Sequence, residues 1–128
     1  MLIAGLVLAG VAALIHVYIF YLESLAWTRA PGRAVFGLIA EQAESTRELA
    51  FNQGFYNLFL AIAAILGIVV TAAGVPAVGL TLVLTGTGSM LAAALVLLLS
   101  SPDKRRAAVT QGFLPLLAVV ATVIGLLV

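Results

Sequence analysis

A few polar side chains lie within or directly beside long apolar stretches of this sequence, where they could do chemistry. The candidates that we select are His16, Glu23, Asn52, Gln53, Tyr56, Asn57 and Gln111. Ionisable and amide groups are expensive in hydrocarbon, so they face a bundle interior or a cavity and are functional candidates by default. We therefore predict that these residues form a polar pocket that binds a small molecule or a lipid.

The same residues exclude several chemistries. One histidine and no cysteine cannot build a closed zinc site, and the carboxylates lie only at the edges of the apolar stretches. No serine or buried acid shares the depth of His16, which argues against a Ser–His–Asp triad. A proton relay through His16 remains open. The sequence assigns no catalytic residue and no metal ligand, leaves the cofactor unknown, and favours a protein that is not an enzyme.

The composition of the chain indicates whether these residues lie in a soluble protein or in a membrane. Charged residues make up 9% of the chain and hydrophobic residues 64%, against about 25% and about 45–50% in soluble domains. All charges lie between Glu23 and Glu48 or between Asp103 and Arg106, too few to cover a soluble surface. The sequence therefore excludes a soluble globular protein, and its net charge of +1 does not suggest a nucleic-acid partner.

The uncharged tracts predict four membrane-spanning helices. A spanning helix needs about 20 apolar residues, and four such segments run over residues 2–26, 49–71, 78–100 and 107–128. Pro76 suits the start of the third helix. The first tract lacks the basic region of a signal peptide, so we expect it to be a mature helix. The predicted fold is an all-α integral membrane four-helix bundle, with residues 1–128 as a single domain.

The basic residues predict the orientation of this bundle. They lie in the first and third loops, at Arg29, Arg33, Arg47, Lys104, Arg105 and Arg106. Because Lys and Arg in short loops stay in the cytoplasm, both termini should lie on the non-cytoplasmic side. The first loop is too long for a simple turn. We expect structure in it, with the second helix starting either near Glu41 or at a capping box on Ser45.

The predicted topology places the seven candidates in the cytoplasmic half. His16 and Glu23 share a helix face but lie ~10 Å apart along the axis. For His16 and Asn57, the nearest expected polar partners are each other and Tyr56. Glu23 could instead pair with one of the arginines of the first loop.

Two further points concern the other polar residues. Asn52 and Gln53 could simply lie at headgroup level, where polarity is cheap. Inside the fourth helix, Pro115 removes a backbone hydrogen bond, which frees the carbonyl of Gln111.

An internal repeat is a further possibility. Gln53-Gly54-Phe55 opens the second predicted helix, and Gln111-Gly112-Phe113 opens the fourth. Both helices run in the same direction, as expected for a parallel repeat of two helical hairpins. The alternative, that these residue types are merely tolerated at a membrane boundary, stays open.

Several segments carry a family resemblance: His16-Val17-Tyr18-Ile19-Phe20, Leu22-Glu23, Val35-Phe36-Gly37-Leu38, Leu49-Ala50-Phe51-Asn52-Gln53-Gly54-Phe55-Tyr56-Asn57 and Gln111-Gly112-Phe113. The chain resembles, over essentially its whole length, the domain-of-unknown-function 1304 family of small bacterial inner-membrane proteins. The resemblance implies four helices, a multi-pass protein of the inner (plasma) membrane, and a family pattern that includes the seven candidates and Gly54. It implies no activity.

Three functions are possible as hypotheses. The first is a non-enzymatic membrane protein whose polar pocket binds a small molecule or lipid, in contact with the bilayer and as a possible homo-oligomer. The second is an accessory subunit of a larger membrane complex, for example a respiratory complex. The third is a small proton-coupled transporter, which ranks last because Glu23 is peripheral.

Overall fold

A computed structural model describes all 128 residues, and every regular element in it is helical. The elements are α1 (Leu2–Phe20), a π-helical turn (Tyr21–Leu25), α2 (Ala30–Phe36), α3 (Ala40–Ser45), α4 (Arg47–Ala72), α5 (Pro76–Ser100), a 3-10 turn (Pro102–Lys104) and α6 (Arg105–Leu127). The prediction of four long apolar helices is confirmed, and Pro76 opens α5 as expected. Each of the four is long and apolar enough to cross a membrane.

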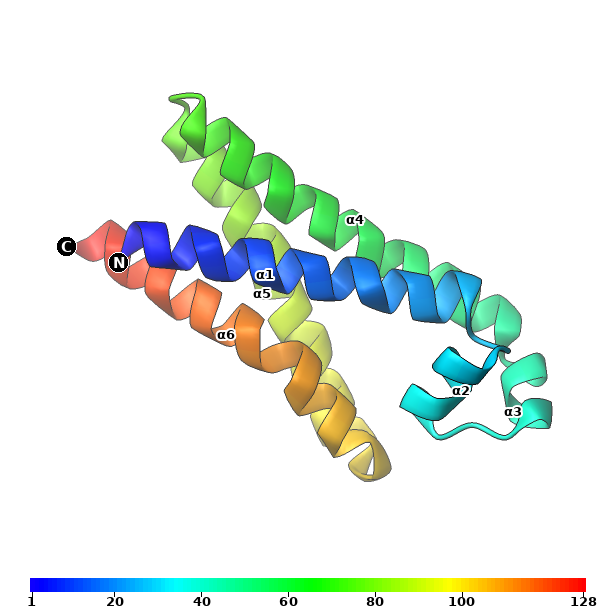
Figure 1. Cartoon of the computed structure of the whole chain (residues 1–128). Coiled ribbons are helices and arrows are strands. Elements are labelled where there is room, and N and C mark those ends of the chain that lie inside the picture. Colours follow the sequence, from blue (N-terminus) through cyan, green and yellow to red (C-terminus); the bar gives the residue numbers. More distant parts are fainter.

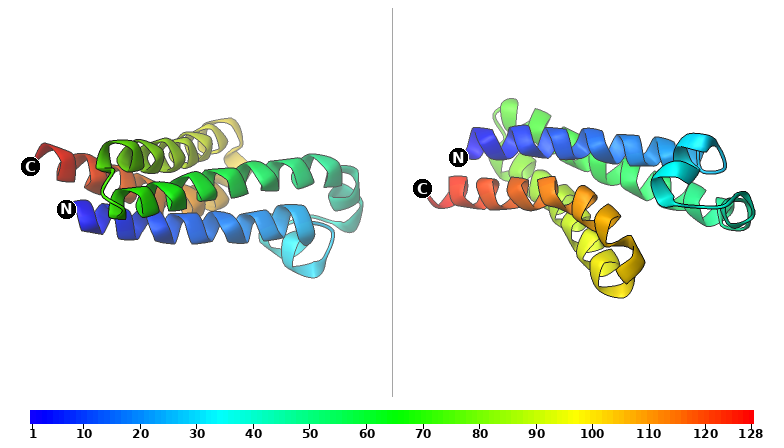
Figure 2. Two further views of the ribbon diagram at one scale, coloured as in Figure 1. Left: turned by 90° about the horizontal axis from the view of Figure 1, so that it is seen from above. Right: turned by 60° about the horizontal axis from the view of Figure 1, so that its bottom comes forward.

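The four long helices form a ring. Helix α1 packs against α4 and α6, and α5 packs against the same two helices from the opposite side. Both chain termini and the α4–α5 turn lie at one end of the bundle, whereas α2, α3 and the α5–α6 turn lie towards the other (Figure 1). At that second end the α5–α6 hairpin diverges from the α1–α4 pair, as the right-hand view in Figure 2 shows.

Small residues bring the helices together. The buried core is dominated by alanines, at Ala9, Ala12, Ala13, Ala61, Ala64 and Ala118, with Met90 and Val83 from α5. Lipid supplies no hydrophobic drive for helix association, so close packing of small side chains must supply the attraction. The core therefore lies along the helix contacts, and the large aliphatic side chains face outward.

Two glycines at matched positions make matched contacts. Gly67 of α4 and Gly125 of α6 lie 58 residues apart, the same offset that separates the two Gln-Gly-Phe triplets. A Cβ on Gly67 would come within 2.6 Å of the α5 backbone at Gly79 and Val83, and one on Gly125 would come within 2.5 Å of the α1 backbone at Leu2. Each glycine thus faces the next helix around the ring, which favours the internal-repeat interpretation.

The first loop is structured, as expected. It contains α2 and the short α3, which begins at Ala40, but the second long helix, α4, starts at Arg47, so the start that we expected near Glu41 is wrong. The capping box on Ser45 does not form, because the Ser45 hydroxyl donates to the Gln42 carbonyl at 3.1 Å and Thr46 precedes α4 without a side-chain cap. A break at Thr46 therefore separates α3 from α4.

Candidate functional site

The site starts from an irregularity at the end of the first membrane span. The Ala26 N–H donates to the Tyr21 carbonyl at 3.0 Å, five residues back, so the last turn is a π-turn. Such turns are rare and frequently occur at functional sites. Leu22 is buried in this turn, while Glu23 is only partly buried. The π-turn therefore fixes the carboxyl group of Glu23 at the edge of the bundle.

Gly54 allows α4 to approach this turn closely. A Cβ at Gly54 would collide with the Ser24 hydroxyl and would lie 3.0 Å from the Ser24 nitrogen and 3.1 Å from the Glu23 Cβ. The Ser24 hydroxyl donates to the Phe51 carbonyl at 2.8 Å. Contact between the two helices at this point requires glycine, because no other residue lacks a Cβ.

This approach brings Asn57 to Glu23. The Asn57 amide Nδ2 donates to Glu23 Oε2 at 2.8 Å and to the Gln53 carbonyl of its own helix at 3.2 Å. The other carboxyl oxygen, Oε1, has no protein partner. Glu23 also forms no ion pair, since the single salt bridge of the chain joins Arg47 to Glu44 at 3.6 Å. The alternative that Glu23 pairs with an arginine of the first loop is therefore wrong.

The other candidates are dispersed. His16 is only 2% exposed, and its Nδ1 lies 2.9 Å from the Ala12 carbonyl, so the expected partnership with Asn57 is wrong. Tyr56 is 58% exposed and is not a partner of either residue. The remaining side chains make no hydrogen bond to the protein and lie exposed on α4, at Asn52 and Gln53, or partly buried on α6, at Gln111. The predicted residues therefore do not form one cluster.

A small hollow adjoins the Glu23 carboxyl group. It has a volume of about 160 Å³ and is lined by Glu23, Ser24, Leu25, Trp27, Thr28, Arg29 and Arg47. This hollow, which we call the headgroup hollow, holds one acidic and two basic side chains. No group of three or more His, Cys, Asp or Glu side chains is arranged to hold a metal ion.

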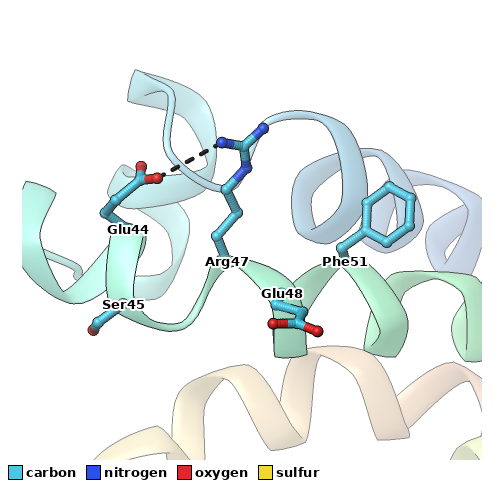
Figure 3. Close-up of a pocket in the computed structure, with 5 residues that line it drawn as sticks. All are labelled: Glu44, Ser45, Arg47, Glu48 and Phe51. Carbon is cyan, nitrogen blue, oxygen red and sulfur yellow. Dashed lines mark ion pairs between the residues drawn. The ribbon is translucent and has the colours of Figure 1, made fainter.

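A second and wider depression lies beside it on the first loop and the start of α4. It measures about 420 Å³ and is lined by Glu44, Ser45, Arg47, Glu48 and Phe51. Figure 3 shows the Arg47 guanidinium turned towards Glu44 and the Phe51 ring one turn further along α4. Arg47 lines both the hollow and the depression, so the two spaces adjoin each other.

The comparison with protein families gives one match. The family model described as "Protein of unknown function (DUF1304)" matches residues 10–123. The chain belongs to the DUF1304 family. Comparisons with curated proteins and with solved structures gave no match. The family resemblance of the sequence is thereby confirmed for this DUF1304 protein, and the match carries no activity.

Sequence reasoning missed Ser24 and the role of Trp27 in this DUF1304 protein. The Trp27 indole N–H donates to the Thr46 hydroxyl at 3.0 Å, which in turn donates to the Gln42 carbonyl at 2.7 Å. The Trp27 ring also packs on Phe36 at 4.9 Å between centroids. A serine beside the only acid of the first span was a usable signal. The tryptophan was not, because an aromatic at a membrane boundary is ordinary.

Proposed function

We propose that this DUF1304 protein is a non-enzymatic integral membrane protein that binds a small molecule or a lipid headgroup at the loop end of the α1–α4 pair. The observation that carries the proposal is the Glu23 carboxyl group. It is held by the π-turn and by Asn57, and its Oε1 has no protein partner beside the headgroup hollow. A polar group held in position with an open acceptor is what a binding site requires.

A purely structural role explains these features less well. Hydrogen bonds between membrane helices stabilise a fold by only ~0.6 kcal/mol on average. This is little compared with the cost of placing an ionisable group at the end of a span. A structural pair would also be complete within the protein, whereas here Oε1 accepts no hydrogen bond and Arg29 forms no ion pair. Glu23 Oε1 and the Arg29 guanidinium are therefore free to bind a ligand.

The charges favour a site that opens to the cytoplasm. All six Lys and Arg residues lie in the two loop regions at one end of the bundle, and such residues remain on the cytoplasmic side. In this orientation both termini are outside the cytoplasm, the headgroup hollow faces the inner leaflet, and the protein resides in the plasma membrane.

The proposed site is smaller than the pocket expected from the sequence. Glu23 and Asn57 contribute side chains and Gln53 contributes its carbonyl. His16 and Gln111 belong to other parts of the bundle in this proposal, and Tyr56 and Asn52 face outward.

The test is isolation of the tagged protein in nanodiscs cut from its own membranes, followed by mass spectrometry of the bound compounds. We expect one defined small molecule or lipid on the wild type and on the exposed control Glu41→Gln, and loss of it from Glu23→Gln/Asn57→Ala. Circular dichroism checks that the double variant is folded. Equal retention by a folded double variant would contradict the proposal.

The same material addresses the alternatives. Stoichiometric copurification of larger subunits, with no retained ligand, would replace the proposal with an accessory subunit of a membrane complex. A pH-driven flux in proteoliposomes that is lost on replacement of His16 would replace it with a transporter. A lone chain or homo-oligomer carrying the ligand supports the proposed function.

A further inference from the structure

The headgroup hollow is lined by side chains of opposite charge. Glu23 lies in the π-turn, whereas Arg29 lies in the first loop and Arg47 begins α4. Arg47 is already engaged by Glu44 at 3.6 Å, but Arg29 forms no ion pair. A ligand that carries only a negative charge would meet Glu23, and one that carries only a positive charge would meet the arginines. A ligand with both charges complements the whole lining.

The free carboxyl oxygen of Glu23 determines which kind of cationic group suits the site. Glu23 Oε1 accepts no hydrogen bond from the protein, while Oε2 accepts one from Asn57 at 2.8 Å. A primary ammonium has N–H groups that can donate to the free oxygen, and charge-assisted bonds of this type are the strong ones. A trimethylammonium group has no N–H and is bulkier. The arginines suit a phosphate, to which guanidinium groups bind in a forked geometry.

The size of the hollow fits a small headgroup. Its volume of about 160 Å³ is several times the ~30 Å³ that one water occupies in the liquid. It can therefore hold a group of a few non-hydrogen atoms, such as an ammonium, two carbons and part of a phosphate.

A row of aromatic rings runs along α4 from the second depression, which Phe51 lines and which shares Arg47 with the hollow. Phe51, Phe55 and Phe59 are spaced four residues apart, with ring centroids separated by 5.1 and 6.2 Å. Phe51 is 50% exposed and Phe59 57%. The row starts one turn after Arg47, which lines the hollow, and it continues into the membrane span. Rings in this position offer a surface for an acyl chain whose headgroup lies at the arginines.

We infer that the ligand of this site is a phospholipid whose headgroup carries a primary ammonium and a phosphate, with the ammonium on Glu23, the phosphate at Arg29 and Arg47, and an acyl chain along the row Phe51, Phe55 and Phe59. The inference rests on the proposed function and names the chemical class of its ligand. The aromatic row distinguishes a lipid from a free zwitterion, which would use the hollow alone.

The test uses the delipidated full chain in detergent, with native mass spectrometry after addition of phospholipids that share the same acyl chains. We expect phosphatidylethanolamine to be retained about tenfold or more over phosphatidylcholine and phosphatidylglycerol, which corresponds to ~1.4 kcal/mol or more. Glu23→Gln should remove the preference over phosphatidylglycerol, and Arg29→Gln should lower retention of phosphatidylethanolamine. The exposed variants Glu41→Gln and Arg105→Gln are the controls.

Three outcomes would overturn the inference. Equal retention of phosphatidylcholine would remove the role of the N–H donor, and preference for phosphatidylglycerol would leave only a basic patch. Competition by free phosphoethanolamine as strong as by the lipid, with Phe59→Ala unchanged, would point to a soluble metabolite. If a different compound depends on Glu23 and Asn57, the proposed function stands and this inference fails. If no compound depends on them, both fail.

Discussion

The two Gln-Gly-Phe triplets lie at equivalent positions near the starts of the parallel helices α4 and α6, yet their surroundings differ. Gly54 touches the π-turn at Ser24 and Glu23, whereas Gly112 faces only the Ala94 methyl group of α5. Three residues beyond each glycine, α4 carries Asn57 and α6 carries Pro115. The counterpart of the Asn57 side-chain amide, which donates a hydrogen bond, is thus a proline ring that has no donor.

The α1–α4 and α5–α6 pairs also differ in the segment that connects their two helices. Helices α1 and α4 are joined through α2 and α3, while α5 and α6 are joined by one 3-10 turn over Pro102–Lys104. The same close-packing device therefore serves both pairs, and only the first has acquired polar groups and a covering loop. In the proposed function, the α1–α4 pair carries the binding site and the α5–α6 pair completes the bundle.

The largest effect should come from the glycine contacts. Gly54→Ala places a methyl group against the Ser24 backbone as well as its hydroxyl, and overpacking of this kind costs about 1–3 kcal/mol. Gly112→Ala should cost a similar amount, because its Cβ would lie 2.6 Å from the Ala94 Cβ, which cannot move without a shift of α5. The free energy of unfolding in mixed detergent micelles measures both.

Gly88→Ala is the control for these variants, since nothing lies within 4 Å of a Cβ at that position. We expect no loss of stability there, because alanine favours the helix over glycine by about 1 kcal/mol. A Gly54→Ala variant as stable as Gly88→Ala would show that the close approach of α4 to the π-turn is not needed.

The next effect should come from Asn57→Ala. This change removes the only hydrogen bond that the protein donates to the Glu23 carboxyl group, and such bonds between membrane helices average ~0.6 kcal/mol with a maximum of ~1.7 kcal/mol. We expect a loss of unfolding free energy within that range. Thr81→Ala, which removes an exposed hydroxyl bonded to its own helix, should change it less. Equal losses would mean that Asn57 does not hold Glu23.

The long helices could be predicted from the sequence, but the partners within the site could not. The distribution of charge and the length of each apolar tract determine where a span can lie, and Pro76 starts a helix for local steric reasons. The partner of Glu23 depends on the π-turn, which contains Glu23 and turns its side chains away from their α-helical directions. Hydropathy does not encode that rotation, so the bond between Glu23 and Asn57 could not be predicted.

Gly54 was visible in the sequence, but its purpose was not. As part of a triplet that recurs in the fourth predicted helix, it indicated an internal repeat but no helix contact. The difference between Gly54 and Gly112 arises from the residues that face them, Ser24 and Ala94. These pairings join segments far apart in the chain, and a single sequence contains no record of them.

A smaller effect concerns the coupling between Ser24 and Gly54. The Ser24 hydroxyl is the atom nearest to a Cβ on Gly54, so Ser24→Ala should partly relieve the strain of Gly54→Ala. In the wild type the same change only removes the bond to the Phe51 carbonyl. We expect a coupling energy of ~0.5–1 kcal/mol in a double-mutant cycle on unfolding free energy. Strict additivity would argue that the strain comes from the backbone alone.

The smallest effect should come from the covering loop, which distinguishes the first pair from the second. Trp27→Phe keeps an aromatic ring against Phe36 but removes the indole donor to the Thr46 hydroxyl. Because this bond is only partly buried, we expect its loss to cost ~0.5 kcal/mol, the low end for a hydrogen bond. Thr46→Val removes the acceptor, and Thr46→Ser retains it. Because the bond joins the end of α1 to the start of α4, its loss should increase amide hydrogen exchange over α2 and α3 and leave α5 and α6 unchanged. If Trp27→Phe accelerates exchange equally in the wild type and in Thr46→Val, the indole acts through its ring alone, and the loop is held by packing.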